Sequence, residues 1–141
     1  YYPPERVNHA VNRLRSRPDA LAVGSSIVYI YFNDLDKIYQ FGPYGAQHAT
    51  AGTFAFKRKL LEQTRYDDDA ELAEEKKFLK NYSIPLVQLD PKKSILVFAH
   101  QDNTFDKRRL LPGHPNFVRE TNMKPRIMIK DKEMREFYMN A

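Results

Sequence analysis

Cysteine is absent from the 141 residues, so the chain forms no disulfide and offers no thiolate to a metal. That absence suits a reducing compartment. No apolar run approaches the roughly 20 residues of a membrane-spanning helix, so we expect no transmembrane segment in this chain. Internal repeats and low-complexity stretches are missing too, and the length fits one domain or a large part of one.

The composition is that of a folded domain. Hydrophobic residues make up 42% of the chain and aromatic residues 13%, which is enough to bury a core. The formal net charge is +5, and the cations occur in short clusters at 57–59, 92–93 and 107–109. Such clusters indicate either a solvated surface or a partner that carries phosphate. The opening Tyr-Tyr-Pro-Pro reads like the middle of a protein, so we expect a piece of a longer one.

Helical and extended segments alternate along the sequence. Prolines and an acid at 3–5 predict the start of a helix with an apolar stripe at Val7, Ala10, Val11 and Leu14. Residues 21–32 are rich in Val, Ile and Tyr and predict one strand with a bulge at 24–26. The other expected elements are an ordered loop at 41–52, strands at 53–56, 84–89 and 94–99, and helices at 57–63, 69–81 and 131–139. This alternation predicts an α/β or α+β layered fold.

One carboxylate lies where an apolar residue is expected. In the predicted helix 69–81, Leu72, Phe78 and Leu79 define an inward face, and Glu75 lies near its centre. Burying an unpaired carboxylate there is costly. Two interpretations stay open: an ion pair with a cation from a neighbouring element, or a general base that an acceptor hydroxyl can reach.

A polar cluster follows the apolar run 95–99, which predicts a strand buried on both faces. His100 stands at the end of that strand, where loops often carry binding groups. It is either a hydrogen-bonded structural residue or a metal ligand, and the basic segment 107–109 fits a metal-bound diphosphate. The other three histidines show no ligand spacing, so no zinc site is expected.

Several short motifs occur in a fixed order over residues 1–110. They are Pro3-Pro4-Glu5-Arg6-Val7, Ala10-Val11, Arg17-Pro18-Asp19-Ala20, Val23-Gly24-Ser25, Gly52-Thr53-Phe54-Ala55-Phe56-Lys57-Arg58, Ala73-Glu74-Glu75-Lys76, and His100 with Asn103-Thr104. This order resembles that of family-2-like GT-A glycosyltransferases. The sequence is also similar to glycosyltransferase-like sequences from large DNA viruses and algae.

The resemblance implies a partial GT-A, Rossmann-like fold, with a mixed sheet and flanking helices. Residues 1–110 would form the C-terminal half of that domain, and 111–141 a C-terminal extension with a terminal helix. In the family, the metal-binding Asp-x-Asp motif directly precedes the stretch that 3–25 resembles. We therefore expect that motif and the nucleotide-binding strands before Tyr1, and no activity from this piece alone. The expected location is the cytoplasm, which for a viral protein is that of the host cell.

The resemblance also implies roles for individual residues. The second acid of the family's Glu-Asp motif is the usual base of inverting members; it corresponds to Glu75, where Glu replaces the usual Asp, with Glu74 as the alternative. His100 would help to hold a divalent cation, Mn²⁺ or Mg²⁺. The donor diphosphate would contact Asn103, Lys107 and Arg108.

Acceptor contacts are expected from Tyr44, Gln47 and His48 in the loop at 41–52, because aromatic rings and amides suit sugar faces and hydroxyls. The implied reaction transfers a sugar from a nucleotide-diphosphate sugar to a hydroxyl of a glycan, protein or lipid, with inversion. One alternative is a non-catalytic glycosyltransferase-like scaffold or binding domain. Another is a nucleic-acid-binding module, but the 23 cations are dispersed among 18 acids, so no nucleic-acid partner is expected.

Overall fold

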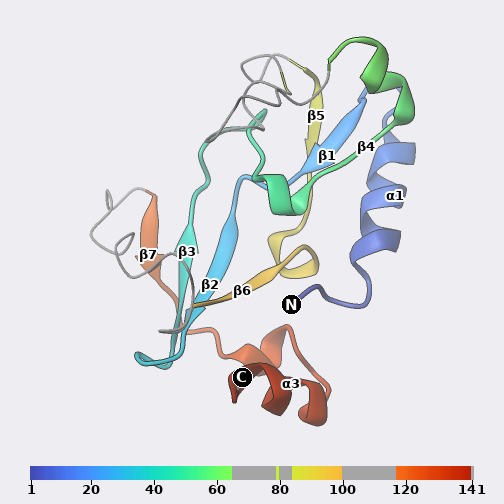
Figure 1. The fold of residues 1–141 in the computed structure, drawn as a ribbon. Coiled ribbons are helices and arrows are strands. Elements are labelled where there is room, and N and C mark those ends of the chain that lie inside the picture. Colours follow the sequence, from blue (N-terminus) through green and yellow to red (C-terminus); the bar gives the residue numbers. More distant parts are fainter. Residues whose placement is uncertain (65–78, 80–83, 100–116, 141) are drawn as a thin grey trace.

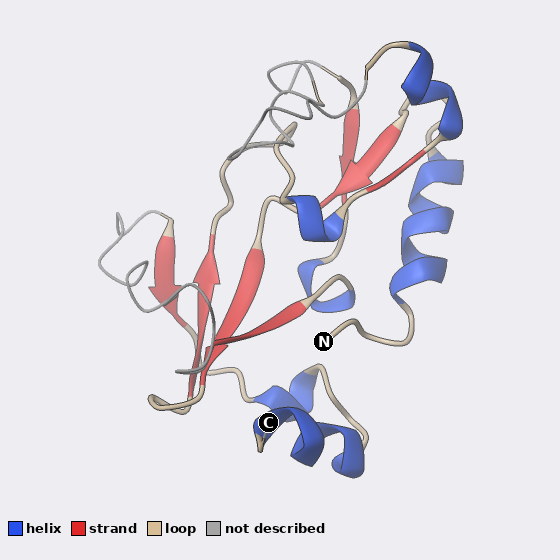
Figure 2. Ribbon diagram, viewed as in Figure 1, coloured by secondary structure: helices blue, strands red, loops and turns tan. Residues whose placement is uncertain are grey.

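The computed structural model describes residues 1–64, 79, 84–99 and 117–140. Over these residues the chain is mixed α/β, with two α-helices and two sheets that each combine parallel and antiparallel neighbours (Figure 2). The predicted α/β class is confirmed at this level. Within the same residues, no helix is long and apolar enough to cross a bilayer.

The first sheet has the strand order β4-β1-β5. Its central strand β1 (Ala22–Gly24) pairs in parallel with β5 (Leu86–Gln88) and antiparallel with β4 (Ala55–Phe56). Helix α1 (Arg6–Ser16) lies beside this sheet (Figure 1). Side chains of the sheet and of the segments beside it form a cluster of buried apolar residues: Ala22, Ala49, Leu60, Leu79, Ile84 and Leu86. Leu79 is thus buried as predicted, whereas the rest of the predicted helix 69–81 lies outside the described residues.

Helix α1 buries a different stripe from the predicted one. Ala10 is buried and Leu14 is half-buried, and both pack with Val23. Val7 and Val11, however, are 69% and 36% exposed, so the prediction is wrong for these two residues. Apolar spacing locates a helix, but the stripe that faces the core depends on how the helix docks.

Two polar side chains of α1 anchor the helix to the rest of the fold. The Arg6 guanidinium donates to the carbonyl oxygens of Ser94 and Gly52, at 2.7 and 2.8 Å. His9 Nε2 accepts the backbone N–H of Asp90 at 2.9 Å, which requires the neutral imidazole. Burial lowers the pKa of His9, which favours that neutral form at pH 7.

The second sheet has the order β6-β2-β3-β7. Strands β2 (Val28–Phe32) and β3 (Lys37–Phe41) form a hairpin, β6 (Leu96–Ala99) pairs in parallel with β2, and β7 (Val118–Glu120) pairs antiparallel with β3. No strand was predicted at β3. Because β6 is an edge strand whose Val97 and Phe98 are half-buried, the prediction that it is buried on both faces is also wrong.

The chain passes from one sheet to the other between Gly24 and Val28. The single strand predicted over 21–32 is therefore wrong: its expected bulge is a break between two strands of different sheets. Residues 86–99 make the same change, from β5 to β6 through the 3₁₀ turn η3 (Pro91–Lys93). Two segments that pair in parallel thus change sheets side by side (Figure 1).

The C-terminal helix and the short helical turns complete the fold. Helix α3 (Lys132–Met139) confirms the helix predicted at 131–139, and its Tyr138 ring lies 5.4 Å from Tyr1 and 5.3 Å from Phe98. The helix predicted at 57–63 is the 3₁₀ helix η2 (Arg58–Glu62). Two further 3₁₀ turns are η1 (Ala51–Thr53) and η5 (Pro125–Ile127).

Two adjacent leucines of η2 test the core of the first sheet. Leu60 is fully buried, whereas Leu61 is 51% exposed. Leu60→Ala leaves a cavity and is expected to lower the free energy of unfolding by roughly 2–5 kcal/mol. The matched control Leu61→Ala is expected to change it by less than about 0.5 kcal/mol. Urea unfolding of both variants measures the difference, and equal losses would contradict this packing.

Candidate functional site

A pocket lies where the parallel strands β1 and β5 end. Its volume is about 480 Å³, and it is lined by residues 25–27, 43–46 and 88–89. Gly24 and Gln88 are paired at the carboxyl ends of these two strands. In open α/β sheets, ligands commonly bind in the crevice outside the carboxyl ends of parallel strands. Both the size and the position of this pocket suit a small ligand.

Ser26 connects one wall of the pocket to the loop opposite. Its side chain is buried, with 2% exposed, and Oγ accepts the backbone N–H groups of Tyr44 and Gly45 at 2.6 and 3.2 Å. Gly42 makes this approach possible: its φ is +94°, and a Cβ there would overlap the carbonyl oxygen of Ser26. The loop is therefore fixed in place, as the predicted ordered loop requires.

Gln88 holds the same loop from the other strand. Its Oε1 accepts the backbone N–H of Ser26 at 2.8 Å, and its Nε2 donates to the carbonyl oxygens of His48 and Ala46 at 2.8 and 3.0 Å. A carbonyl of the loop, that of Gly45, lies 3.5 Å from the same nitrogen. One amide thus satisfies peptide groups of both the break and the loop.

Tyr44 supplies an aromatic surface at the pocket. Its ring stacks on Phe117 at 5.2 Å and 19° and lies 5.1 Å from the imidazole of His48. Tyr44 is still 44% exposed, so part of the ring is open to a ligand. Burial raises the pKa of Tyr44, and its hydroxyl is therefore protonated at neutral pH and able to donate.

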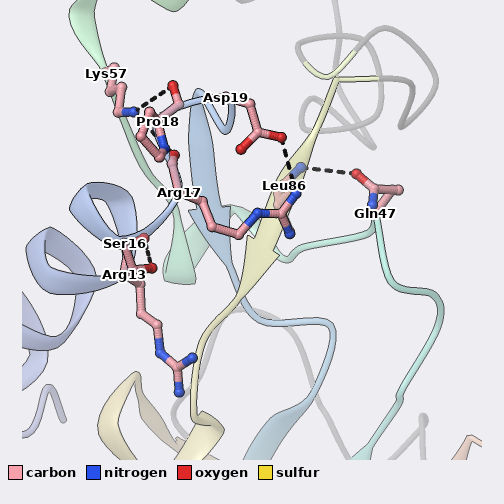
Figure 3. A network of polar contacts seen from close by, with 8 residues as sticks. All are labelled: Arg13, Ser16, Arg17, Pro18, Asp19, Gln47, Lys57 and Leu86. Atoms are coloured by element: carbon pink, nitrogen blue, oxygen red, sulfur yellow. Dashed lines mark hydrogen bonds and ion pairs between the residues drawn. The ribbon is translucent and has the colours of Figure 1, made fainter.

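The other two expected acceptor residues have different surroundings. Gln47 does not line the pocket; its Oε1 accepts the N–H of Leu86 at 2.9 Å and so binds the loop to β5 (Figure 3). His48 is half-buried against Tyr44, and its carbonyl oxygen is a partner of Gln88. Of the three residues expected from the sequence, Tyr44 alone lines this pocket.

Basic side chains gather at the end of α1 and the start of η2. Lys57 Nζ lies 3.4 and 3.3 Å from the carbonyl oxygens of Arg17 and Pro18, and Arg17 forms an ion pair with Asp19 at 3.2 Å (Figure 3). Lys57 therefore ties β4 to the end of α1. In the basic cluster 57–59, Lys57 thus has a structural role.

The remaining predicted site residues lie outside the described residues. They are Glu74, Glu75, His100, Asn103, Lys107 and Arg108. In the part of the chain that the structure does describe, no group of three His, Asp or Glu side chains is arranged as metal ligands would be.

Sequence reasoning missed Ser26 and Gln88. Ser26 was assigned to a bulge, and Gln88 was included in a strand without comment. A signal was present for Gln88, because it is a long amide inside the otherwise apolar run 84–89. A half-buried amide needs partners, and such partners often lie in a loop far along the chain.

Comparison with protein-family models, with curated proteins and with solved structures gives no match for this chain. The description of the chain as mixed α/β, with a pocket at the ends of two parallel strands, therefore rests on its own structure.

The variant Gln88→Glu tests the attachment of the loop. A carboxylate still accepts the N–H of Ser26 but cannot donate to the loop carbonyls, so a loss of about 1–3 kcal/mol in unfolding free energy is expected. Amide hydrogen exchange over 44–48 is expected to accelerate. Gln63→Glu is the matched control, since Gln63 is exposed and the same chemical change there is expected to be nearly neutral. Unchanged exchange in Gln88→Glu would contradict the assigned hydrogen bonds.

Proposed function

We propose that this chain is the acceptor-side part of a metal-dependent glycosyltransferase, which transfers a sugar from a nucleotide-diphosphate sugar to an acceptor hydroxyl with inversion. The pocket between β1, β5 and the loop 42–50 would bind the acceptor sugar. The observation that carries this proposal is the half-exposed Tyr44 ring beside a pocket at the carboxyl ends of two parallel strands.

The chemistry of the pocket supports a sugar as its ligand. Sugar rings have one apolar face of C–H groups and a rim of hydroxyls. A rigid aromatic ring packs against the first, and hydroxyl, amide and backbone groups bind the second. Tyr44, which stacks on Phe117 and stays 44% exposed, offers such a ring, and Ser26 offers a buried hydroxyl.

The catalytic roles rest on the resemblance of the sequence motifs. Glu75, or Glu74 in its place, would take the proton of the acceptor hydroxyl. Asn103, Lys107 and Arg108 would bind the donor diphosphate. His100 would be a ligand of Mn²⁺ or Mg²⁺, a cation that offsets the negative charge of a diphosphate leaving group.

Tyr44 variants test the acceptor pocket. Tyr44→Ala removes the ring, and the affinity for a simple hexoside is expected to fall roughly three- to tenfold, which corresponds to about 0.7–1.4 kcal/mol. Tyr44→Phe keeps the ring and is expected to bind nearly as well. Amide chemical-shift titrations with methyl hexopyranosides measure both, and equal affinity of the alanine variant would exclude stacking on this ring.

Glutamate variants test the base in a polypeptide that also carries a donor-binding half. Glu75→Gln is expected to lower sugar transfer by roughly 10²- to 10⁴-fold while nucleotide-sugar affinity stays unchanged. Glu74→Gln tests the alternative base: it is expected to retain turnover if Glu75 is the base, and to lose turnover if Glu74 takes its place. Retained turnover in Glu75→Gln would remove Glu75 as the base. An absence of Mn²⁺-dependent nucleotide-sugar binding in the parent polypeptide would instead favour a non-catalytic scaffold.

A further inference from the structure

The described residues that line the pocket at the ends of β1 and β5 are all uncharged. Among the described residues that line it there is no Lys, Arg, His, Asp or Glu. A ligand carboxylate or phosphate that entered would lose hydration and gain no ionic partner from this lining. An uncharged ligand rich in hydroxyls loses less, because polar groups of the wall replace its water.

Ser26 has one hydrogen-bonding function left for a ligand. A serine hydroxyl has two acceptor positions and one donor proton. Both acceptor positions of Ser26 Oγ are taken by the N–H groups of Tyr44 and Gly45. The described residues provide no acceptor for its proton, although the side chain is buried and lines the pocket. An unused donor in such a position suits an oxygen atom of a ligand.

Gln88 is committed elsewhere. Its oxygen accepts the N–H of Ser26, and its two N–H groups donate to the carbonyl oxygens of Ala46 and His48. Gln88 thus shapes the wall of the pocket, and Ser26 is the side chain of this pair that is free to contact a ligand.

We propose that the acceptor is an uncharged sugar and that the Ser26 hydroxyl donates a hydrogen bond to one of its oxygens. This inference rests on the proposed acceptor pocket. It restricts the class of acceptor, because uronic and sialic acids are excluded as the bound sugar. Tyr44 would pack against the sugar ring, while the Ser26 hydroxyl would select for an oxygen at one position of the sugar.

The first experiment compares ligands that differ only in charge. Methyl glucopyranoside and methyl galactopyranoside are titrated against the corresponding uronates by amide chemical shifts, at about 0.15 M salt to screen the net charge of +5. The neutral glycosides are expected to bind at least about tenfold more tightly. Equal or tighter binding of a uronate overturns the inference while the acceptor pocket stands. If no sugar shifts the amide signals of 44–46, the acceptor pocket itself is wrong, and this inference fails with it.

The second experiment isolates Ser26 from its role in holding the loop. Monodeoxy analogues of the better glycoside are titrated against the parent chain and against Ser26→Ala. In the parent chain, one analogue is expected to bind about fivefold more weakly than the full glycoside. In Ser26→Ala, the same analogue and the full glycoside are expected to bind equally well. If Ser26→Ala does not fold, the parent chain still gives a result. If no monodeoxy analogue binds the parent chain more weakly than the full glycoside, no specific hydrogen-bond donor contacts the sugar, and the inference is overturned. Losses that are the same in both proteins overturn the role of Ser26.

Discussion

Where the chain leaves the first sheet for the second, its buried peptide groups have no strand beside them. Buried N–H and C=O groups must still be hydrogen-bonded. Backbone N–H groups bind the carbonyl oxygens of Gly24 and Ser25 here, whereas the N–H groups of Ser25 and Ser26 depend on side chains. Thr53 accepts the N–H of Ser25 at 2.8 Å, and Gln88 accepts that of Ser26. Without these two side chains, the N–H groups of Ser25 and Ser26 would be buried without acceptors. The passage of the chain from the first sheet to the second therefore depends on Thr53 and Gln88.

The same hydrogen bonds also determine the shape of the pocket. Because Gln88 and Ser26 both bind the loop 42–50, the loop is attached to the ends of β1 and β5 rather than free in solvent. Gln47 adds a further attachment to the outer edge of β5. Loops positioned by a rigid scaffold are common sites of binding. The position of Tyr44 follows from this attachment and from its stacking on Phe117.

Local signals in the sequence predicted several elements well. Prolines with an acid located the start of α1, Asp131 located that of α3, and apolar runs located β5 and β6. These signals depend on neighbours along the chain. The ordered loop was also predicted correctly, since glycine and proline mark loops, and its hydrogen bonds to Ser26 and Gln88 hold it in place.

The failures came where distant contacts decide the structure. Residues 21–32 are apolar on both sides of Gly24-Ser25-Ser26, which predicts a bulge, and nothing local shows that the two serines bind partners beyond position 40 and divide the strand. Strand β3 follows a polar turn and was not predicted, although Ile38, Tyr39 and Phe41 are residue types that favour strands. The exposed faces of Val7 and Val11 reflect the docking of α1 through Arg6 and His9. Ser26 and Gln88 escaped notice for the same reason.

The parallel pairing of the two segments has a consequence for the order of folding. Ala22 pairs with Leu86 and Tyr29 with Leu96. Neither parallel pair of strands can form until the long stretch of chain between its two partners has folded back. Contacts so distant along the chain slow folding, because the entropy of loop closure is lost before the contacts form. The β2–β3 hairpin and α1 are local and can form early. During synthesis the pocket would therefore appear only after β5 has left the ribosome, long after its other wall has been made.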